Sequence, residues 1–184
     1  MEGPMEIVNM NTLNESQRKQ AAQMLSDELP MGWPTLAEAI DEVNELLGDD
    51  PDFVLLAAMD NGEVLGWCGM QPNYDGKVFE LHPLVVRRDR QGKGIGTALL
   101  NAIEAAAREK GGLTFWAGAD DESGETSFAN ADLYDDLPKR IREFEPGTHQ
   151  SAFYLKHGFK IVGVIPDANG KGKPDIFLAK SLSK

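Results

Sequence analysis

A glycine-rich turn in the middle of the chain limits the available folds more than any other feature. Residues 90–97 read RQGKGIGT and separate an apolar, strand-like run from a segment of helical periodicity. The first N–H groups of a helix have no partner inside it, and such groups bind phosphate. Gly94 and Gly96 allow a phosphate to approach the main chain where a Cβ atom would obstruct it. The cations in or beside the turn are Arg87, Arg88, Arg90 and Lys93.

Two other phosphate motifs fit this turn less well. A Walker A loop needs Lys-Ser or Lys-Thr after its last glycine, whereas Ile95, Gly96 and Thr97 stand here. The dinucleotide fingerprint needs glycine or alanine at Thr97 and a surrounding parallel β-α-β pattern, which the neighbouring segments lack. A glycine turn without any ligand is the remaining alternative.

The other segments predict one domain over residues 1–184, of mixed α/β class. A chain of 184 residues with 41% hydrophobic content is long enough for one core, and no linker divides it. We expect strands at 6–10, 53–59, 63–70, 78–86, 113–116, 159–164 and 175–182. We expect helices at 14–29, 36–47, 95–110 and 149–157. This order implies a mostly antiparallel sheet covered by helices.

Two local signals mark where elements begin and turn. Asn14, followed three residues later by Gln17, is typical of a capping box at a helix start. The Asn61-Gly62 step between two apolar runs favours a tight antiparallel hairpin.

The charge and cysteine content restrict partners and location. A formal net charge of -12 repels nucleic acid and anionic lipid and favours a cationic ligand, although acidity also serves solubility alone. No apolar run approaches ~18 residues and no export signal is visible, so we expect a cytoplasmic protein without a membrane partner. The single cysteine, Cys68, lies in an apolar segment and predicts a packing role, with no disulfide or metal site.

The turn resembles a known signature. Gln91-x-x-Gly94-x-Gly96 after a strand is similar to the acetyl-CoA motif of GNAT acetyltransferases. The resemblance implies the GNAT fold, with a splayed cleft for acetyl-CoA, whose pantetheine arm pairs with the backbone of Leu84, Val85 and Val86. Pro83 independently suits a bulge there, because it removes a ladder donor. The residues implied to hold the pyrophosphate are Gln91, Gly92, Lys93, Gly94, Ile95, Gly96 and Thr97.

A second segment, FYLKHGF at 153–159, resembles another GNAT signature. In that family the tyrosine at the position of Tyr154 lies near the cofactor sulfur. A phenol within hydrogen-bond reach can protonate the departing thiolate, so Tyr154 is a candidate general acid. The alternative is a tyrosine that packs its ring against the sheet.

Glu80 and His82 are the candidate groups for the acceptor amine. They are two apart on one strand, so their side chains share a face beside the acetyl position expected near Leu84. An ammonium is not nucleophilic, so a carboxylate or imidazole must hold it and draw off a proton. The alternatives are a structural histidine at His82 and an ion pair of Glu80 with an arginine. A rival route through an acetyl-cysteine at Cys68 lacks a neighbouring base in its segment.

The resemblance narrows to aminoglycoside 6′-N-acetyltransferases in the segments 79–86, 120–121, 132–134 and 163–176. It implies a homodimer that acetylates the 6′-amine of an aminoglycoside, with Trp33 and Tyr74 near the sugar. Asp120 and Asp121 open an acidic segment that suits a polyamine sugar, or is simply a solvated loop. The segment between Tyr134 and Tyr154 departs from the family.

Two other functions remain open from the sequence. The first is a GNAT enzyme for another small amine, such as a polyamine. The second is a non-catalytic acetyl-CoA-binding module, which the joint presence of Glu80, His82 and Tyr154 disfavours.

Overall fold

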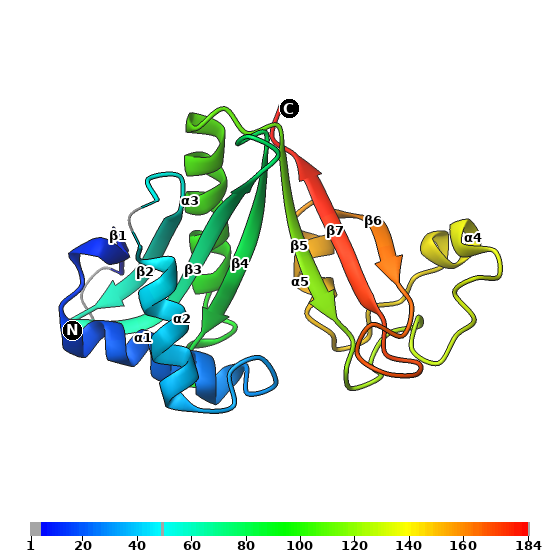
Figure 1. The fold of residues 1–184 in the computed structure, drawn as a ribbon, viewed down its shortest axis with the longest axis horizontal. Coiled ribbons are helices and arrows are strands. Elements are labelled where there is room, and N and C mark those ends of the chain that lie inside the picture. The colour runs from blue at the N-terminus through cyan, green and yellow to red at the C-terminus, as the bar shows by residue number, and fades with distance from the viewer. Residues whose placement is uncertain (1–4, 49, 184) are drawn as a thin grey trace. The chain divides into compact units, whose positions relative to one another are not determined.

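The chain forms two compact units (Figure 1). The computed structural model describes residues 5–48 and 50–183. One unit lies within Met1–Leu113 together with Ser183, and the other within Thr114–Leu182. Each unit has its own strands and helices, and the expected single domain over residues 1–184 stays a prediction.

The first unit is built on a four-stranded sheet. Its strands are β1 (Glu6–Asn9), β2 (Val54–Asp60), β3 (Glu63–Asn73) and β4 (Val78–Val86). They pair in this order, and all three pairings are antiparallel. Asn61 and Gly62 have positive φ values of 48° and 83°, so the predicted β2–β3 hairpin is confirmed.

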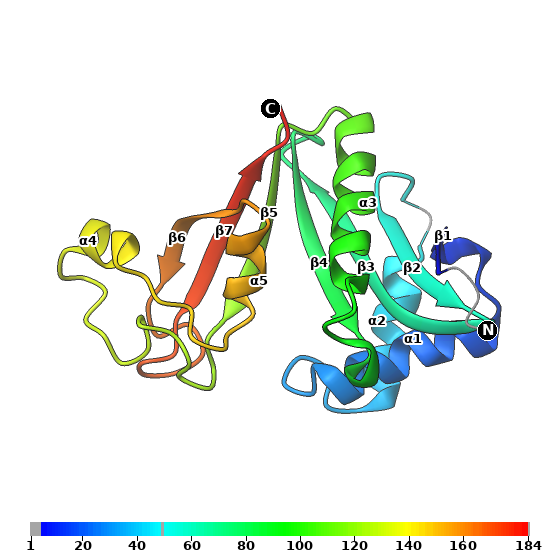
Figure 2. The ribbon, with the colours of Figure 1, turned by 180° about the vertical axis from the view of Figure 1, so that it is seen from behind.

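Helices cover both faces of this sheet (Figures 1 and 2). They are α1 (Glu15–Glu28), α2 (Leu36–Leu46) and α3 (Ile95–Glu109), with short 3-10 turns at Met10–Thr12 and Arg88–Arg90. The predicted capping box of Asn14 and Gln17 starts α1, and Thr35 with Glu38 forms another at α2. Helices α1 and α2 lie on one face, whereas α3 lies on the other.

Strand β3 is buried between these two layers of helix. The Trp67 indole Nε1–H donates to the carbonyl of Ala21 on α1 at 3.0 Å. On the opposite face, the Cys68 thiol lies 3.8 Å from the carbonyl of Leu99 on α3. Burial raises the pKa of the Cys68 thiol, and only a thiolate is a good nucleophile. Cys68 therefore has the predicted packing role, and an acetyl-cysteine route is disfavoured.

Strand β4 carries a bulge at the place where Pro83 predicts one. Leu84 pairs with Cys68 and Leu81 with Met70, so β4 has one residue more than β3 between these pairs. A Cβ atom on Gly69, opposite the bulge, would lie 2.5 Å from the His82 carbonyl oxygen. Glycine at this position therefore allows the two backbones to approach closely.

The second unit contains a three-stranded antiparallel sheet. Its strands β5 (Thr114–Asp120), β6 (Lys160–Ile165) and β7 (Asp175–Ser181) pair in the order β5-β7-β6. Helix α5 (Ser151–Lys156) packs on β7. Helix α4 (Leu137–Arg142) was not predicted, and β5 continues beyond the predicted end at Trp116.

The strands paired within both units run antiparallel and are accompanied by helices, which confirms the predicted α/β class. The splayed cleft implied by the resemblance stays a prediction. Among the helices of the described residues, none is long and apolar enough to cross a membrane.

Candidate functional site

Glu80 lies half-buried on β4, directly opposite Gln71 of β3. The Gln71 amide Nε2–H donates to Glu80 Oε2 at 3.0 Å. Across residues 5–48 and 50–183, no arginine or lysine pairs with Glu80, so the alternative of a structural ion pair is not seen. The amide occupies one carboxylate oxygen of Glu80, which leaves the other oxygen for a further partner.

His82 contacts two side chains from the helical layer. Its Nε2 lies 3.2 Å from Glu42 Oε1 on α2. The Trp33 ring lies 5.8 Å from the imidazole, centroid to centroid, at 52°. Trp33 lies in the loop between α1 and α2, and its backbone N–H donates to the Leu29 carbonyl at 3.1 Å. The structure therefore places Trp33 beside His82 and adds Glu42 to this group.

A cavity of about 340 Å³ adjoins this face. Gln71 and His82 line it, together with three carboxylates from residues 42–50: Glu42, Glu45 and Asp50. Carboxylates around a concave surface attract cations. Tyr74 lies in the β3–β4 turn with φ of 50°, is 79% exposed, and belongs to the same unit.

The glycine turn adopts the conformation that a helix N-terminus needs to face an anion. Gly92 and Gly94 have φ values of 73° and 84°, in the left-handed region that favours glycine. Gly94 is the N-cap of α3 and offers no side chain to its first N–H groups. A Cβ atom on Gly92 or Gly94 would meet nothing within 4 Å. The turn therefore leaves space for a phosphate group at this helix terminus.

Side chains also fix the turn and limit its charge. Gln91 Nε2–H donates to the carbonyl of Val86 at 2.9 Å, which ties the turn to the end of β4. Arg88 donates to Glu28 from its backbone N–H and its Nε, at 3.0 and 3.2 Å. Arg87 pairs with carboxylates as well, whereas Lys93 has no carboxylate within 4 Å in the described part of the chain. Less free positive charge surrounds the turn than its sequence suggests.

Asp120 and Asp121 have different environments at the end of β5 in the second unit. Asp120 is exposed, and its Oδ1 accepts a hydrogen bond from Asn169 Nδ2. Asp121 is buried, and its two oxygens accept three hydrogen bonds from Glu125 and Thr126. Both oxygens of Asp121 thus order their own loop. Asp120 is the member of the pair exposed for the expected substrate contact.

The protonation of Asp121 reflects this hydrogen bonding. Burial opposes ionisation, but the hydrogen bonds from the Thr126 side chain and the Glu125 and Thr126 backbones outweigh it. The pKa of the Asp121 carboxyl is therefore lowered.

Tyr154 lies on α5 with an aromatic environment. Its ring centroid is 5.6 Å from that of Phe153 and 5.5 Å from that of Phe159. The residue is only 6% exposed, so the ring is held firmly. Packing of the Tyr154 ring is compatible with a role of its hydroxyl as a general acid, because a ring that is held in place also holds the hydroxyl in place.

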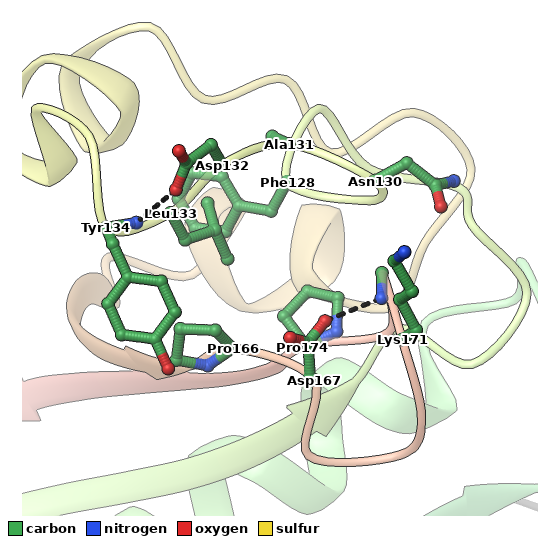
Figure 3. A pocket seen from close by; sticks show the side chains of 11 residues that line it. Phe128, Asn130, Ala131, Asp132, Leu133, Tyr134, Pro166, Asp167, Lys171 and Pro174 are labelled. Atoms are coloured by element: carbon green, nitrogen blue, oxygen red, sulfur yellow. Dashed lines mark hydrogen bonds between the residues drawn. The ribbon is translucent and has the colours of Figure 1, made fainter.

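The second unit has a separate cavity of about 280 Å³ (Figure 3). Apolar side chains, among them Phe128 and Leu133, line it together with Lys171. The nearby carboxylates serve the backbone: Asp132 accepts from Tyr134 N–H at 3.0 Å, and Asp167 from Gly172 N–H at 2.6 Å. In the described residues no group of three or more His, Cys, Asp or Glu is arranged to hold a metal ion.

Comparison with known proteins decides the family. The sequence profile of the acetyltransferase (GNAT) family matches residues 18–134. The chain belongs to this family. It is an acetyltransferase, which sets aside the non-catalytic alternative, and members of this family use acetyl-CoA. The glycine turn is the part of the described structure that fits the phosphates of such a cofactor.

Individual relatives share one named activity. A crystal structure of an aminoglycoside 6′-N-acetyltransferase complexed with coenzyme A is 34% identical, with a TM-score of 0.91, over 97% of this chain and 98% of that one. The enzyme from Enterococcus faecium is also 34% identical, with a TM-score of 0.87, over the same shares. A type 1 aminoglycoside N(6′)-acetyltransferase of Stenotrophomonas maltophilia is 30% identical over 86 residues, 43% of this chain and 56% of that protein.

Sequence reasoning missed Glu42 and Gln71. Gln71 was within reach, because counting back from the β3–β4 turn places it opposite Glu80. Glu42 is 40 residues from His82 and carries no local signal. Only the packing of α2 on the sheet brings it to the imidazole.

We predict that Asp121→Asn destabilises the folded protein by about 1–3 kcal/mol at neutral pH, because buried N–H donors lose a charged acceptor. A lowered folded-state pKa contributes stability above the ordinary carboxyl pKa of about 4, and this is lost as pH falls through the lowered value. The stability difference from wild type should therefore shrink below about pH 4. Urea unfolding between neutral and acidic pH measures it. Asp120→Asn is the control, and equal effects of both variants would contradict the assignment.

Proposed function

We propose that this acetyltransferase moves the acetyl group of acetyl-CoA to the 6′-amine of an aminoglycoside. The observation that carries the proposal is the pair Glu80 and His82 on one face of β4, with Glu80 free of any cationic side chain within the described residues. The names of the similar proteins support the choice of substrate. The carboxylates of Glu42, Glu45 and Asp50 line the cavity beside His82 and suit a ligand with several ammonium groups.

Acetyl-CoA supplies a thioester, an acetyl group activated for transfer. We infer that the turn from Gln91 to Thr97 holds its pyrophosphate through the N–H groups at the start of α3. The backbone of Leu84 to Val86 pairs with the pantetheine arm. A backbone N–H near Leu84 would stabilise the oxyanion that forms during transfer.

On the acceptor side, Glu80 holds the ammonium in place for the loss of its proton. Trp33, packed against His82, and exposed Tyr74 contribute to binding the sugar. Asp120 contacts another ammonium group of the ligand. A homodimer, which the resemblance implies, and a cytoplasmic location complete the proposal.

The phosphate assignment predicts a difference between the two ends of α3. Gly94 and Gly111 have φ values of 84° and 83°, with open space at each Cβ position. Alanine at either site strains the backbone by about 1–2 kcal/mol. Gly94→Ala should also weaken CoA binding by about 10-fold or more, because the added Cβ atom occupies space that the phosphate needs to reach the N–H groups, which disrupts a charge-assisted hydrogen bond. Calorimetry on both variants measures this, and an equal CoA affinity in the two would refute the assignment.

Glu80→Gln tests the acceptor assignment almost isosterically. Loss of the charge should cost about 1–3 kcal/mol of interaction with the bound 6′-ammonium. An aminoglycoside with a 6′-hydroxyl lacks that ammonium, so its binding should respond much less. The two drugs and two proteins form a double-mutant cycle. Equal weakening of both drugs would mean that Glu80 contacts another amine or supports the fold.

A comparison of specificity constants tests the identity of the substrate. Specificity constants for kanamycin-type drugs and for polyamines, measured on the wild-type enzyme, rank the aminoglycoside against the other small-amine alternative. A higher constant for a polyamine would overturn the aminoglycoside proposal.

Tyr154 is the proposed acid for the departing thiolate. Tyr154→Phe keeps the ring and removes the proton, so kcat should fall by roughly 10- to 1000-fold while substrate affinities hardly change. Tyr134→Phe makes the same chemical change at an 82% exposed residue of the same unit and serves as the control. Steady-state kinetics of the two variants decide, and an unaltered kcat in Tyr154→Phe would leave this tyrosine a packing role.

A further inference from the structure

The contact between Glu42 and His82 indicates that His82 and Glu80 have separate tasks on the acceptor face, the side of β4 where the amine would bind. This inference rests on the proposed function. We propose that Glu42 is a positioning residue that holds His82 as the Nε2–H tautomer. His82 Nδ1 is then the atom that takes the proton from the ammonium bound by Glu80.

The direction of the hydrogen bond fixes the tautomer. His82 Nε2 and Glu42 Oε1 are 3.2 Å apart. An ionised carboxylate accepts hydrogen bonds and donates none, so Nε2 carries the hydrogen atom. In a neutral imidazole the other nitrogen, Nδ1, then has the lone pair that can accept a proton.

The surroundings hold the imidazole and the carboxylate in place. The His82 and Glu42 side chains are 37% and 24% exposed, which leaves each partly accessible and partly packed. Val43, the next residue of α2, is buried in the core between the helices and the sheet and anchors the helix that carries Glu42. Trp33 packs against the imidazole from the loop before α2, and the bulge opposite Gly69 fixes the backbone of His82. Three different segments thus position one ring.

Glu80 has a different environment and a different task. Its Oε2 accepts a hydrogen bond from the Gln71 amide, and its other oxygen is available to accept one from an ammonium. In the proposed step, an N–H bond of the ammonium breaks and its electron pair stays on nitrogen. The proton goes to His82 Nδ1. The resulting imidazolium is stabilised by the Glu42 carboxylate, as the carboxylate of a catalytic triad stabilises its histidine.

The tautomer is directly measurable, because the chain has only three histidines. His149 Nε2 lies 2.9 Å from the Asp120 carbonyl and His157 Nδ1 lies 2.8 Å from the Phe153 carbonyl, so these two provide an Nε2–H and an Nδ1–H reference. Imidazole 15N shifts, recorded at about pH 8.5, well above the ordinary imidazole pKa, identify each form. We expect His82, assigned with His82→Gln, to be Nε2–H in the free enzyme. An Nδ1–H form would overturn the inference.

Glu42→Gln, with Asp41→Asn as its control, tests the role in turnover. Both variants remove one negative charge from α2, but Asp41 is exposed and does not line the cavity, and only Glu42 bonds to His82. A positioned base contributes about 10²- to 10⁴-fold. Partial loss of its orientation should lower kcat about 10-fold and add an Nδ1–H population, with an unchanged KM for acetyl-CoA. Asp41→Asn should keep one tautomer and a kcat within about twofold of wild type. Equal kcat losses in both variants would overturn the inference.

The two proposals fail separately. If aminoglycosides are not acetylated but His82 is Nε2–H, the substrate assignment is wrong and the tautomer assignment stands. If they are acetylated while His82 is Nδ1–H, the function stands and the role of Glu42 is wrong. The wild-type spectrum gives this answer even if Glu42→Gln does not fold.

Discussion

The close approach of two backbones at the β4 bulge is the constraint on which the acceptor face depends. Gly69 has no side chain, so the His82 carbonyl can lie where a Cβ atom would otherwise stand. The extra residue in β4 changes which side chains share a face. Val85 thereby joins the core under α1 and α2, on the side where His82 meets Glu42. Without the bulge, strict alternation would place Val85 and His82 on opposite faces.

The electrostatics of this protein depend more on the partners of individual carboxylates than on the net charge. The total of -12 suggests a general affinity for cations. The structure shows that individual carboxylates have separate tasks. Glu28 holds Arg88 beside the turn, Asp121 orders a loop, and Glu42 contacts an imidazole. Glu80 is held in place by the side-chain amide of Gln71.

The sequence predicted those parts of the fold that depend on local signals. The ends of β4 were predicted at Val78 and Val86, because alternation and the flanking turn mark them. The Asn61-Gly62 hairpin and the cap at Asn14 follow equally local rules. Helix α4 was missed because its six residues follow an acidic stretch and start from a cap, Asp136, with an unusual positive φ.

The acceptor site was only partly predictable for a related reason. Glu80 and His82 are found from strand periodicity alone, but Glu42 depends on how a helix packs on the sheet. Strand pairing, in contrast, places β3, which carries Gln71, between β2 and β4. A strand so enclosed opens only when the whole unit unfolds, whereas exposed loops open by local fluctuation. The strand that carries Gln71 therefore keeps its place beside Glu80 as each ligand arrives and leaves.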